Sequence, residues 1–156
     1  MVDQDTLADS FTAFVLETEP RLRHALCAGF GGDIGREATA QALAYGWEHW
    51  SRVSVMANPA GYLWGVGRSH ARRQRRVRPA FPALPVDVMP WIEPSLPAAL
   101  ARLSERQRVT VMLVHGLEWT FSEVAVLLGV SKSTVQTQAE RGMAKLRRQI
   151  GVGDER

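Results

Sequence analysis

Apolar residues recur at helical spacing along most of the chain, and the clearest pattern lies between Phe121 and Arg141. Four apolar residues in this stretch share the spacing that places side chains on one helical face: Val124, Ala125, Leu127 and Leu128. Gly129 follows them, where a helix end favours a residue that accepts positive φ. Ser131 is then a good N-cap for a second helix. The pattern predicts two helices joined by a tight turn, which is a helix-turn-helix.

The second helix of this motif has an apolar and a polar side. Its inward positions are Thr134, Val135, Ala139, Met143 and Leu146. Its other side carries hydrogen-bonding and cationic side chains: Lys132, Ser133, Gln136, Thr137, Gln138 and Arg141. A helical hairpin of purely structural role would share this spacing, but the polar outer side favours DNA binding.

Helical spacing also predicts the elements that precede this motif. Residues 5–28 are expected to form a helix that Pro20 kinks or divides. Asp33 is the expected N-cap of a second helix over residues 33–50, with Trp47 on its buried side. Asn58 and Pro59 mark the start of a third helix, as N-cap and first helical residue.

Six prolines between residues 79 and 97 predict an extended linker between two helical units. Val88, Met89, Trp91 and Ile92 are too apolar for a bare spacer, and we expect them to dock on a partner or on one of the domains. After the linker, Ser104 and Gln107 fit a capping box at the start of a further helix. The predicted fold class is therefore all-α, with two small helical domains. They are an N-terminal bundle of about three helices (residues 1–78) and a helix-turn-helix domain (residues 98–150), followed by a tail (residues 151–156).

Charge is distributed unevenly along these 156 residues. Residues 1–50 hold eight acids against three bases, whereas residues 51–94 hold seven bases against two acids. Residues 95–156 hold nine bases against six acids. An acidic front and a basic remainder suggest different partners, with the basic parts facing nucleic acid.

The third predicted helix ends in a run of one charge sign. Six arginines fall between Arg68 and Arg78, and this stretch holds no acid. A solvated helix face usually mixes both signs, so the run favours contacts with phosphates.

Other chemistry is not indicated. Cys27 is the only cysteine, and although it is spaced from His24 like a metal ligand pair, no second pair exists. The sequence has no Gly-rich phosphate loop and no plausible nucleophile–base spacing, so we expect no enzyme activity, catalytic residue, metal, cofactor or small-molecule substrate. The acidic N-terminus leads into no long apolar run, which predicts a cytoplasmic protein without membrane insertion.

The order of elements resembles the extracytoplasmic-function (ECF, group IV) sigma factors of the RNA polymerase sigma-70 family. The resemblance is carried by Leu103-Ser-Glu-Arg-Gln-Arg-Val, by Gly116-Leu-Glu-Trp-Thr-Phe-Ser-Glu-Val-Ala-Val-Leu-Leu-Gly-Val-Ser and by Thr134-Val-Gln. A looser match, colinear with the family, includes Phe11 and Phe14, Gly32-Asp33, and Asn58-Pro-Ala-Gly-Tyr-Leu-Trp-Gly-Val-Gly-Arg-Ser-His-Ala-Arg-Arg.

This resemblance implies a protein that binds core RNA polymerase, reads two promoter elements and helps open the downstream one. It places polymerase contacts at Glu37 and Gln41 of the second helix. It places upstream-element contacts at Ser131, Lys132, Ser133, Thr134, Gln136, Thr137, Gln138 and Arg141. Contacts with the downstream element fall on Tyr62, Trp64, Arg68, Ser69, Arg72, Arg73, Arg75 and Arg76. The family often has anti-sigma partners, so an anti-sigma protein is a candidate partner.

Residue chemistry agrees with this division. Gln136 and Gln138 can each pair bidentately with adenine, and Lys132 and Arg141 suit phosphates. Tyr62 and Trp64 can stack on exposed bases, although core packing is the commoner role of such aromatic residues.

Some positions depart from the family's pattern. The usual acidic pair and glutamine of the polymerase-binding helix are represented by Glu37-Ala38 and Gln41, and a common asparagine is Ser69. Gln136, Thr137 and Gln138 replace a basic residue, a serine and an arginine, and the two lost cations should weaken phosphate binding. Two alternatives stay open: a stand-alone helix-turn-helix regulator, and a sigma-like adapter that binds polymerase without reading promoters.

Overall fold

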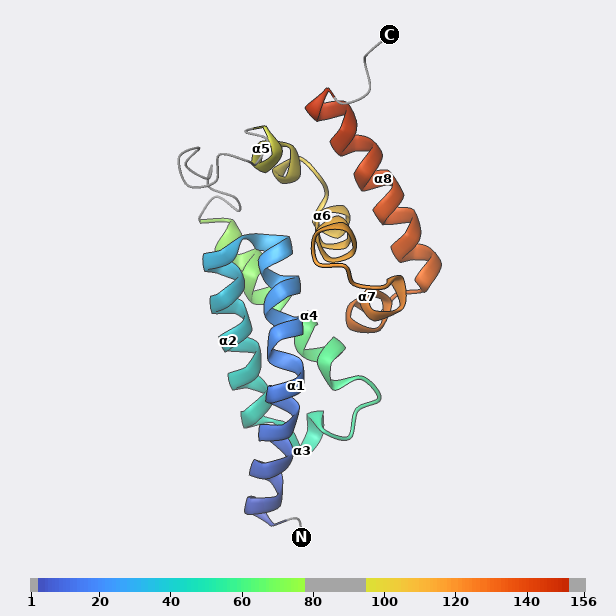
Figure 1. Cartoon of the computed structure of the whole chain (residues 1–156). Coiled ribbons are helices and arrows are strands. Elements are labelled where there is room, and N and C mark those ends of the chain that lie inside the picture. The colour runs from blue at the N-terminus through green and yellow to red at the C-terminus, as the bar shows by residue number, and fades with distance from the viewer. Residues whose placement is uncertain (1–2, 78–94, 152–156) are drawn as a thin grey trace.

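The computed structural model describes residues 3–77 and 95–151, and every regular element in these two ranges is a helix (Figure 1). The α-helices are α1 (Gln4–Phe30), α2 (Gly32–Glu48), α3 (Trp50–Val53), α4 (Pro59–Arg75), α5 (Leu96–Ala101), α6 (Glu105–Val111), α7 (Phe121–Leu128) and α8 (Lys132–Ile150). A π-helix, η1 (Met112–Gly116), continues α6. The all-α prediction is confirmed. Most of the predicted linker, including its four apolar residues, lies outside the described residues.

The N-terminal half (residues 3–77) is built from α1, α2 and α4. Helix α1 runs through Pro20 without interruption, and Gly31, at a φ of 86°, reverses the chain into α2. Gly35 lets these two helices approach closely, since a Cβ there would lie 2.5 Å from the backbone of Cys27. Leu22, Leu26 and Leu63 are fully buried between the three helices. Their burial contributes to the stabilisation of this half.

Helix α4 begins as its sequence predicts. The side chain of Asn58 accepts a hydrogen bond from the backbone N–H of Gly61 at 2.9 Å, and Pro59 occupies the first helical position. The start of α4, after the loop that follows α3, is therefore determined by residues next to it in the sequence.

The C-terminal half (residues 95–151) has capped helices and a helix-turn-helix. Ser104 and Thr120 each close a capping box, with Gln107 and Glu123 as the third helical residues of α6 and α7. Gly129 ends α7 at a φ of 67°, and Ser131 Oγ accepts from the backbone N–H of Thr134 at 3.1 Å. The predicted helix-turn-helix is therefore present, with α7 and α8 as its two helices.

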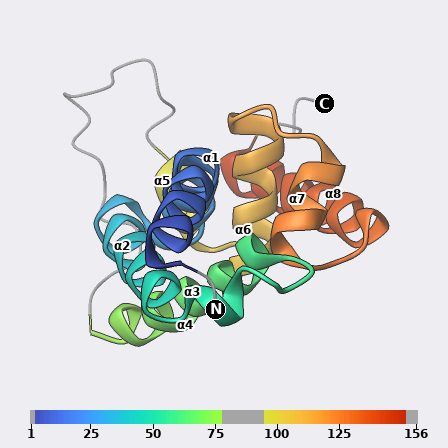
Figure 2. The ribbon, with the colours of Figure 1, turned by 90° about the horizontal axis from the view of Figure 1, so that it is seen from below.

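The two halves pack against each other (Figures 1 and 2). One hydrophobic cluster contains Leu22, Leu26 and Trp64 of the N-terminal half together with Val109 and Leu113 of the C-terminal half. A second, smaller cluster stays within the C-terminal half and joins α5, α6 and α8. Helix α8 lies at the edge of the molecule farthest from α2 (Figure 1).

Some local predictions are wrong. Of the two outcomes expected at Pro20, the division of the helix is wrong, because one uninterrupted helix, α1, spans this residue. Gly31, not Asp33, caps α2; Asp33 lies in the first turn and pairs with Arg36 at 2.9 Å. Trp47 is 50% exposed, although its ring packs on that of Phe11 with the ring centroids 5.2 Å apart. The second helix ends at Glu48, and a short separate helix, α3, takes up the next residues.

Candidate nucleic-acid interface

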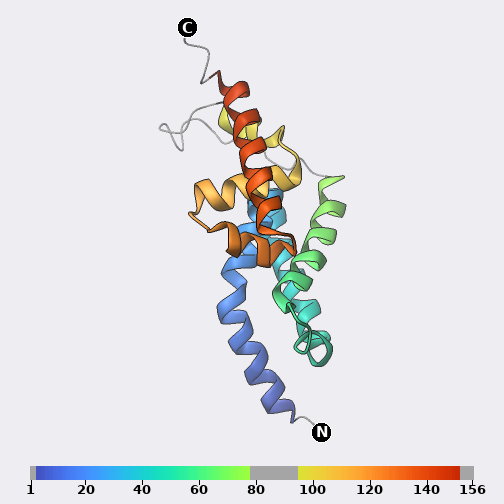
Figure 3. The ribbon, with the colours of Figure 1, turned by 90° about the vertical axis from the view of Figure 1, so that its right-hand side faces the viewer.

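The polar side of α8 is accessible to a partner. Helix α8 runs across the front of the molecule in Figure 3. Thr134 and Gln138 are half-buried, and the other predicted contacts on this helix are exposed: Lys132, Ser133, Gln136, Thr137 and Arg141. Gln136 Nε2 donates to Glu140 Oε1 at 3.3 Å, a long hydrogen bond that a base edge can replace.

The hydroxyl groups at the start of α8 form a local network. Ser131 Oγ lies 2.7 Å from Thr134 Oγ1 and 3.1 Å from Ser133 Oγ. These hydroxyls order the first turn of the helix, where free backbone N–H groups and the helix dipole favour an anion. Lys132 is exposed beside them. This end of α8 therefore suits a phosphate oxygen.

The arginine run of α4 is divided between solvent and the interface of the two halves. Arg73, Arg75 and Arg76 are exposed, as is Ser69. Arg68 is half-buried, and Arg72 forms an ion pair with Glu105 of α6. The guanidinium donates to the same carboxylate oxygen through Nε at 2.9 Å and Nη2 at 2.7 Å. A stretch of sequence without acids thus meets an acid from the other half.

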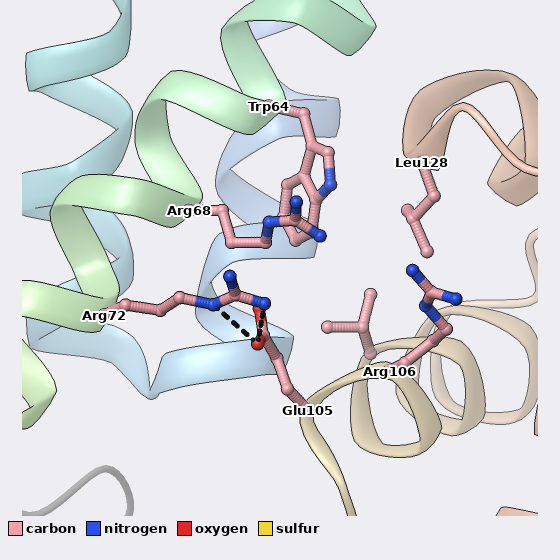
Figure 4. A pocket seen from close by; sticks show the side chains of 7 residues that line it. Trp64, Arg68, Arg72, Glu105, Arg106 and Leu128 are labelled. Atoms are coloured by element: carbon pink, nitrogen blue, oxygen red, sulfur yellow. Dashed lines mark hydrogen bonds and ion pairs between the residues drawn. The ribbon is translucent and has the colours of Figure 1, made fainter.

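Figure 4 shows the small cavity of about 50 Å³ beside this ion pair. Its walls come from α4, α6 and α7, through Trp64, Arg68, Arg72, Glu105, Arg106, Val109 and Leu128. Burial lowers the pKa of Arg68 below its usual value, and the charges of Arg72 and Arg106 lower it further while Glu105 opposes them. The cavity is therefore a site where several cations share one carboxylate.

Trp64 and Tyr62, the two predicted stacking residues, are placed differently. Trp64 is 4% exposed and packs between the halves, so its ring cannot stack on a base in this arrangement. Tyr62 is half-buried, with its hydroxyl 3.3 Å from that of Tyr45 and the guanidinium of Arg52 5.7 Å from its ring centroid. Hydrogen bonds with Tyr45 and then Arg52 lower the pKa of Tyr62. Tyr62 is therefore held in a polar network at the molecule's surface.

The predicted polymerase-binding residues lie on α2. Glu37 and Gln41 are both exposed and are one helical turn apart. Glu37 Oε1 is 3.6 Å from Nε2 of His70 on α4. Their shared exposure is compatible with a protein contact along this helix.

The contacts between the halves include polar residues that sequence reasoning did not identify. Arg108 is fully buried and donates to the carbonyl oxygen of Gly29 through Nε at 2.9 Å and Nη2 at 2.7 Å. Asn58 Nδ2 donates to the carbonyl oxygen of Val126 at 2.6 Å. The arginine lies 79 positions from its partner and the asparagine 68 positions from its own, so no local pattern indicated either contact.

Within residues 3–77 and 95–151, no group of three or more His, Cys, Asp or Glu side chains could hold a metal ion. Across the same ranges, none of the helices combines the length and apolar character needed to cross a bilayer.

Sequence comparisons find similarity to known sigma factors. The family model described as sigma-70, region 4 matches residues 95–146, which include the helix-turn-helix. RNA polymerase sigma factor CarQ of Myxococcus xanthus is 34% identical over 83 residues, which cover 53% of this chain and 47% of that protein. The matched part of the chain thus spans about half the length of this relative.

A solved structure resembles the whole arrangement. It is the co-crystal structure of the sigma factor RpoE in complex with the anti-sigma factor NepR from Bartonella quintana. The match has a TM-score of 0.64 and 18% identity, and it covers 92% of this chain and 98% of that chain. At this identity the likeness establishes a shared fold over both halves.

Proposed function

We propose that the chain is a sigma factor of the extracytoplasmic-function group of the sigma-70 family, which binds core RNA polymerase and directs transcription initiation at specific promoters. The observation that carries this proposal is the exposed polar side of α8, which lies inside the region matched to sigma-70 region 4. A capped, solvent-facing second helix is what a helix-turn-helix inserts into the major groove.

Helix α8 reads the upstream promoter element in this proposal. The amide side chains of Gln136 and Gln138 pair with adenine edges, each contact discriminating by about 1–3 kcal/mol. Lys132 and Arg141 neutralise phosphates, and the hydroxyls of Ser131, Ser133, Thr134 and Thr137 position the first turns of the helix. Only two of these side chains carry a full positive charge, so binding should depend weakly on salt.

Helix α4 binds the downstream element. Arg73, Arg75 and Arg76 are exposed and free to follow a DNA backbone, and Ser69 lies beside them. Arg68 and Arg72 would join them once the other half moves away. Tyr62 is within reach of a base at the surface, whereas Trp64 becomes available only when the halves separate.

The division into domains follows these roles. Residues 1–78 form a region-2-like unit that contacts polymerase through Glu37 and Gln41 of α2. Residues 98–150 form the region-4-like unit, joined by the Pro-rich linker over residues 79–97. An anti-sigma protein is a further partner, supported by the RpoE structure, in which the sigma factor is bound to one.

The test of the function is a pull-down with purified core RNA polymerase, followed by transcription on a genomic fragment library. Stable binding with start sites that share a two-part upstream motif is the expected result. Binding without promoter-specific transcripts would favour the adapter alternative. Failure to bind polymerase, with a discrete operator found by DNA selection, would favour the stand-alone regulator.

Replacing the two glutamines tests the assignment of α8. Gln136→Ala with Gln138→Ala should abolish selectivity for the upstream element while polymerase binding survives. Arg147→Ala with Arg148→Ala, two exposed residues in the last turn of the same helix, is the control and should keep promoter choice. Unchanged promoter choice in the glutamine double variant would contradict the assignment.

A further inference from the structure

The cavity of Figure 4 is rich in hydrogen-bond donors. The indole Nε1 of Trp64 is buried and has no hydrogen-bond partner among the described residues. This nitrogen lies on the side of the ring that faces Leu128 and Arg106 (Figure 4). The guanidinium groups of Arg68 and Arg106 bring further N–H donors to the walls of the same cavity. Buried donors in proteins are almost always paired, so an acceptor that enters this cavity would satisfy them.

The walls of the cavity also carry an excess of positive charge. They hold three arginines, Arg68, Arg72 and Arg106, and one acid, Glu105. Glu105 Oε2 accepts both hydrogen bonds of Arg72, so this carboxylate is already paired with one of the three cations. Burial, and then the charges of Arg72 and Arg106, lower the pKa of Arg68. A small anion between these groups would relieve their mutual repulsion.

The volume of the cavity limits the size of such an anion. The cavity measures about 50 Å³. One bound water needs roughly 10–15 Å³ of such space, so the cavity has room for about four waters. A tetrahedral anion with four oxygens has this size, whereas a strand of nucleic acid is far larger.

Glu105 supplies a means of selecting one oxyanion from another. Its Oε1 is buried and has no hydrogen-bond partner among the residues that the structure describes. A carboxylate oxygen repels an anion without protons, but it accepts a hydrogen bond from an anion that carries one. Phosphate keeps at least one O–H group at neutral pH, whereas sulfate has none. The cavity therefore favours phosphate over sulfate.

We propose that the cavity between α4, α6 and α7 binds a phosphate group. Its oxygens accept hydrogen bonds from Trp64, Arg68 and Arg106, and its O–H group donates to Glu105 Oε1. Arg72 stays paired with Glu105 Oε2 and orients the carboxylate. The ligand is inorganic phosphate or the terminal group of a phosphate ester, whose other atoms would lie outside the cavity. The site does not depend on the proposed role in transcription.

Isothermal titration calorimetry of the full chain at pH 7 tests the site. Sodium phosphate, sodium sulfate and AMP are the probes, with ionic strength held constant by sodium chloride. Phosphate should bind about 10-fold more tightly than sulfate, because only phosphate gains the hydrogen bond with Glu105. AMP distinguishes the two sources of the phosphate group. Binding of AMP at least as tight as that of phosphate would identify a phosphate ester, and weaker binding would identify the free ion.

Two variants locate the binding site. Trp64→Phe removes the indole donor and keeps an aromatic ring, and it should weaken phosphate binding about 10-fold. Its control is Trp47→Phe, at the half-exposed tryptophan of α2. Arg106→Gln removes a cation at an exposed position, which leaves folding intact, and it should weaken binding about 2- to 5-fold. Its control is Arg102→Gln, an exposed arginine outside the cavity.

A third variant tests the selectivity. In Glu105→Gln the amide oxygen should turn towards the donors of Arg72, which places the amide nitrogen where Glu105 Oε1 lies. An amide N–H donates to sulfate and cannot accept from the O–H of phosphate. The ratio of phosphate to sulfate affinity should therefore fall from about 10 to about 1.

Three results would count against the proposal. Phosphate that binds no more tightly than chloride would overturn the site. Phosphate affinity that matches the controls in both Trp64→Phe and Arg106→Gln would place the anion elsewhere on the protein and would overturn the site as well. An unchanged ratio of phosphate to sulfate affinity in Glu105→Gln would refute the contact with Glu105.

Discussion

Arg108 is the most informative position for stability, because it is a fully buried cation that spans the two halves. Its guanidinium donates twice to the carbonyl oxygen of Gly29 and once, at 3.0 Å, to that of Leu103. Burial lowers the pKa of Arg108 to about 10, with a smaller contribution from Arg75, so the group stays charged at neutral pH. Arg108→Ala would leave both carbonyls without these donors and remove the buried carbons of the side chain.

The expected cost follows from these contacts. A hydrogen bond from a charged donor contributes about 1.5–3 kcal/mol, and each buried carbonyl left without its donor costs about 1–3 kcal/mol. We expect Arg108→Ala to lower the free energy of unfolding by about 3–5 kcal/mol, a large share of the ~5–15 kcal/mol typical of a native protein. Arg108→Lys should lose roughly half as much, since an ammonium cannot reach both carbonyls in the same planar geometry.

The assay is urea denaturation followed by circular dichroism, with Arg106→Ala as the matched control on the same helix. Arg106 is exposed, so its replacement should change the free energy of unfolding by less than about 0.5 kcal/mol. The difference between the two variants should persist between about pH 6 and pH 8. The lowered pKa of Arg108 counts against folding at every pH below about 10 and is relieved only above it. A loss below about 1 kcal/mol for Arg108→Ala would refute the reasoning.

Three further predictions concern single features. Arg73→Ala with Arg76→Ala should reduce permanganate reactivity of the downstream element in polymerase complexes. The same variant should lower the slope of log affinity against log salt concentration for single-stranded DNA by about 1.4, and normal values of both would mark these arginines as solvated surface. Gly129→Ala should destabilise by about 1–2 kcal/mol, because φ is 67° there, and an unchanged thermal midpoint would contradict this. Burial raises the pKa of the Cys27 thiol, so stability should fall as pH rises above about 9, where the unfolded chain loses its proton first. Iodoacetamide should also alkylate folded Cys27 more slowly than the urea-unfolded chain, and equal rates would count against burial as the cause.

Sequence reasoning succeeded where the determining contacts are local. The caps at Asn58, Ser104 and Ser131 each involve a residue three positions away, and the turn at Gly129 depends on that residue's own backbone. Such signals are read directly from neighbouring residues. The two helices of the helix-turn-helix and the outward side of α8 were therefore predictable.

Contacts between the halves were not predictable, because they depend on packing rather than on spacing. Arg72 and Glu105 are 33 positions apart, and nothing near either residue indicates the other. The arginine run was expected to contact phosphates, whereas one of its members, Arg72, pairs with a carboxylate of α6 in this structure. Trp47 shows a second limit: helical spacing placed it on the side of the core, but spacing does not determine how far neighbouring helices cover a side chain, and half of Trp47 is exposed.

The core shared between the halves has a consequence for the lifetime of the protein. A unit the size of residues 95–151 buries only about 60% of its unfolded surface and is marginally stable by itself. Val109 and Leu113 obtain part of their burial from the N-terminal half. If the two halves separated in a chain without a partner, the C-terminal half would therefore unfold more often. Proteases would then cleave this chain faster than a chain whose halves stay packed together or one held by a partner. The abundance of the protein would then follow the supply of its partners.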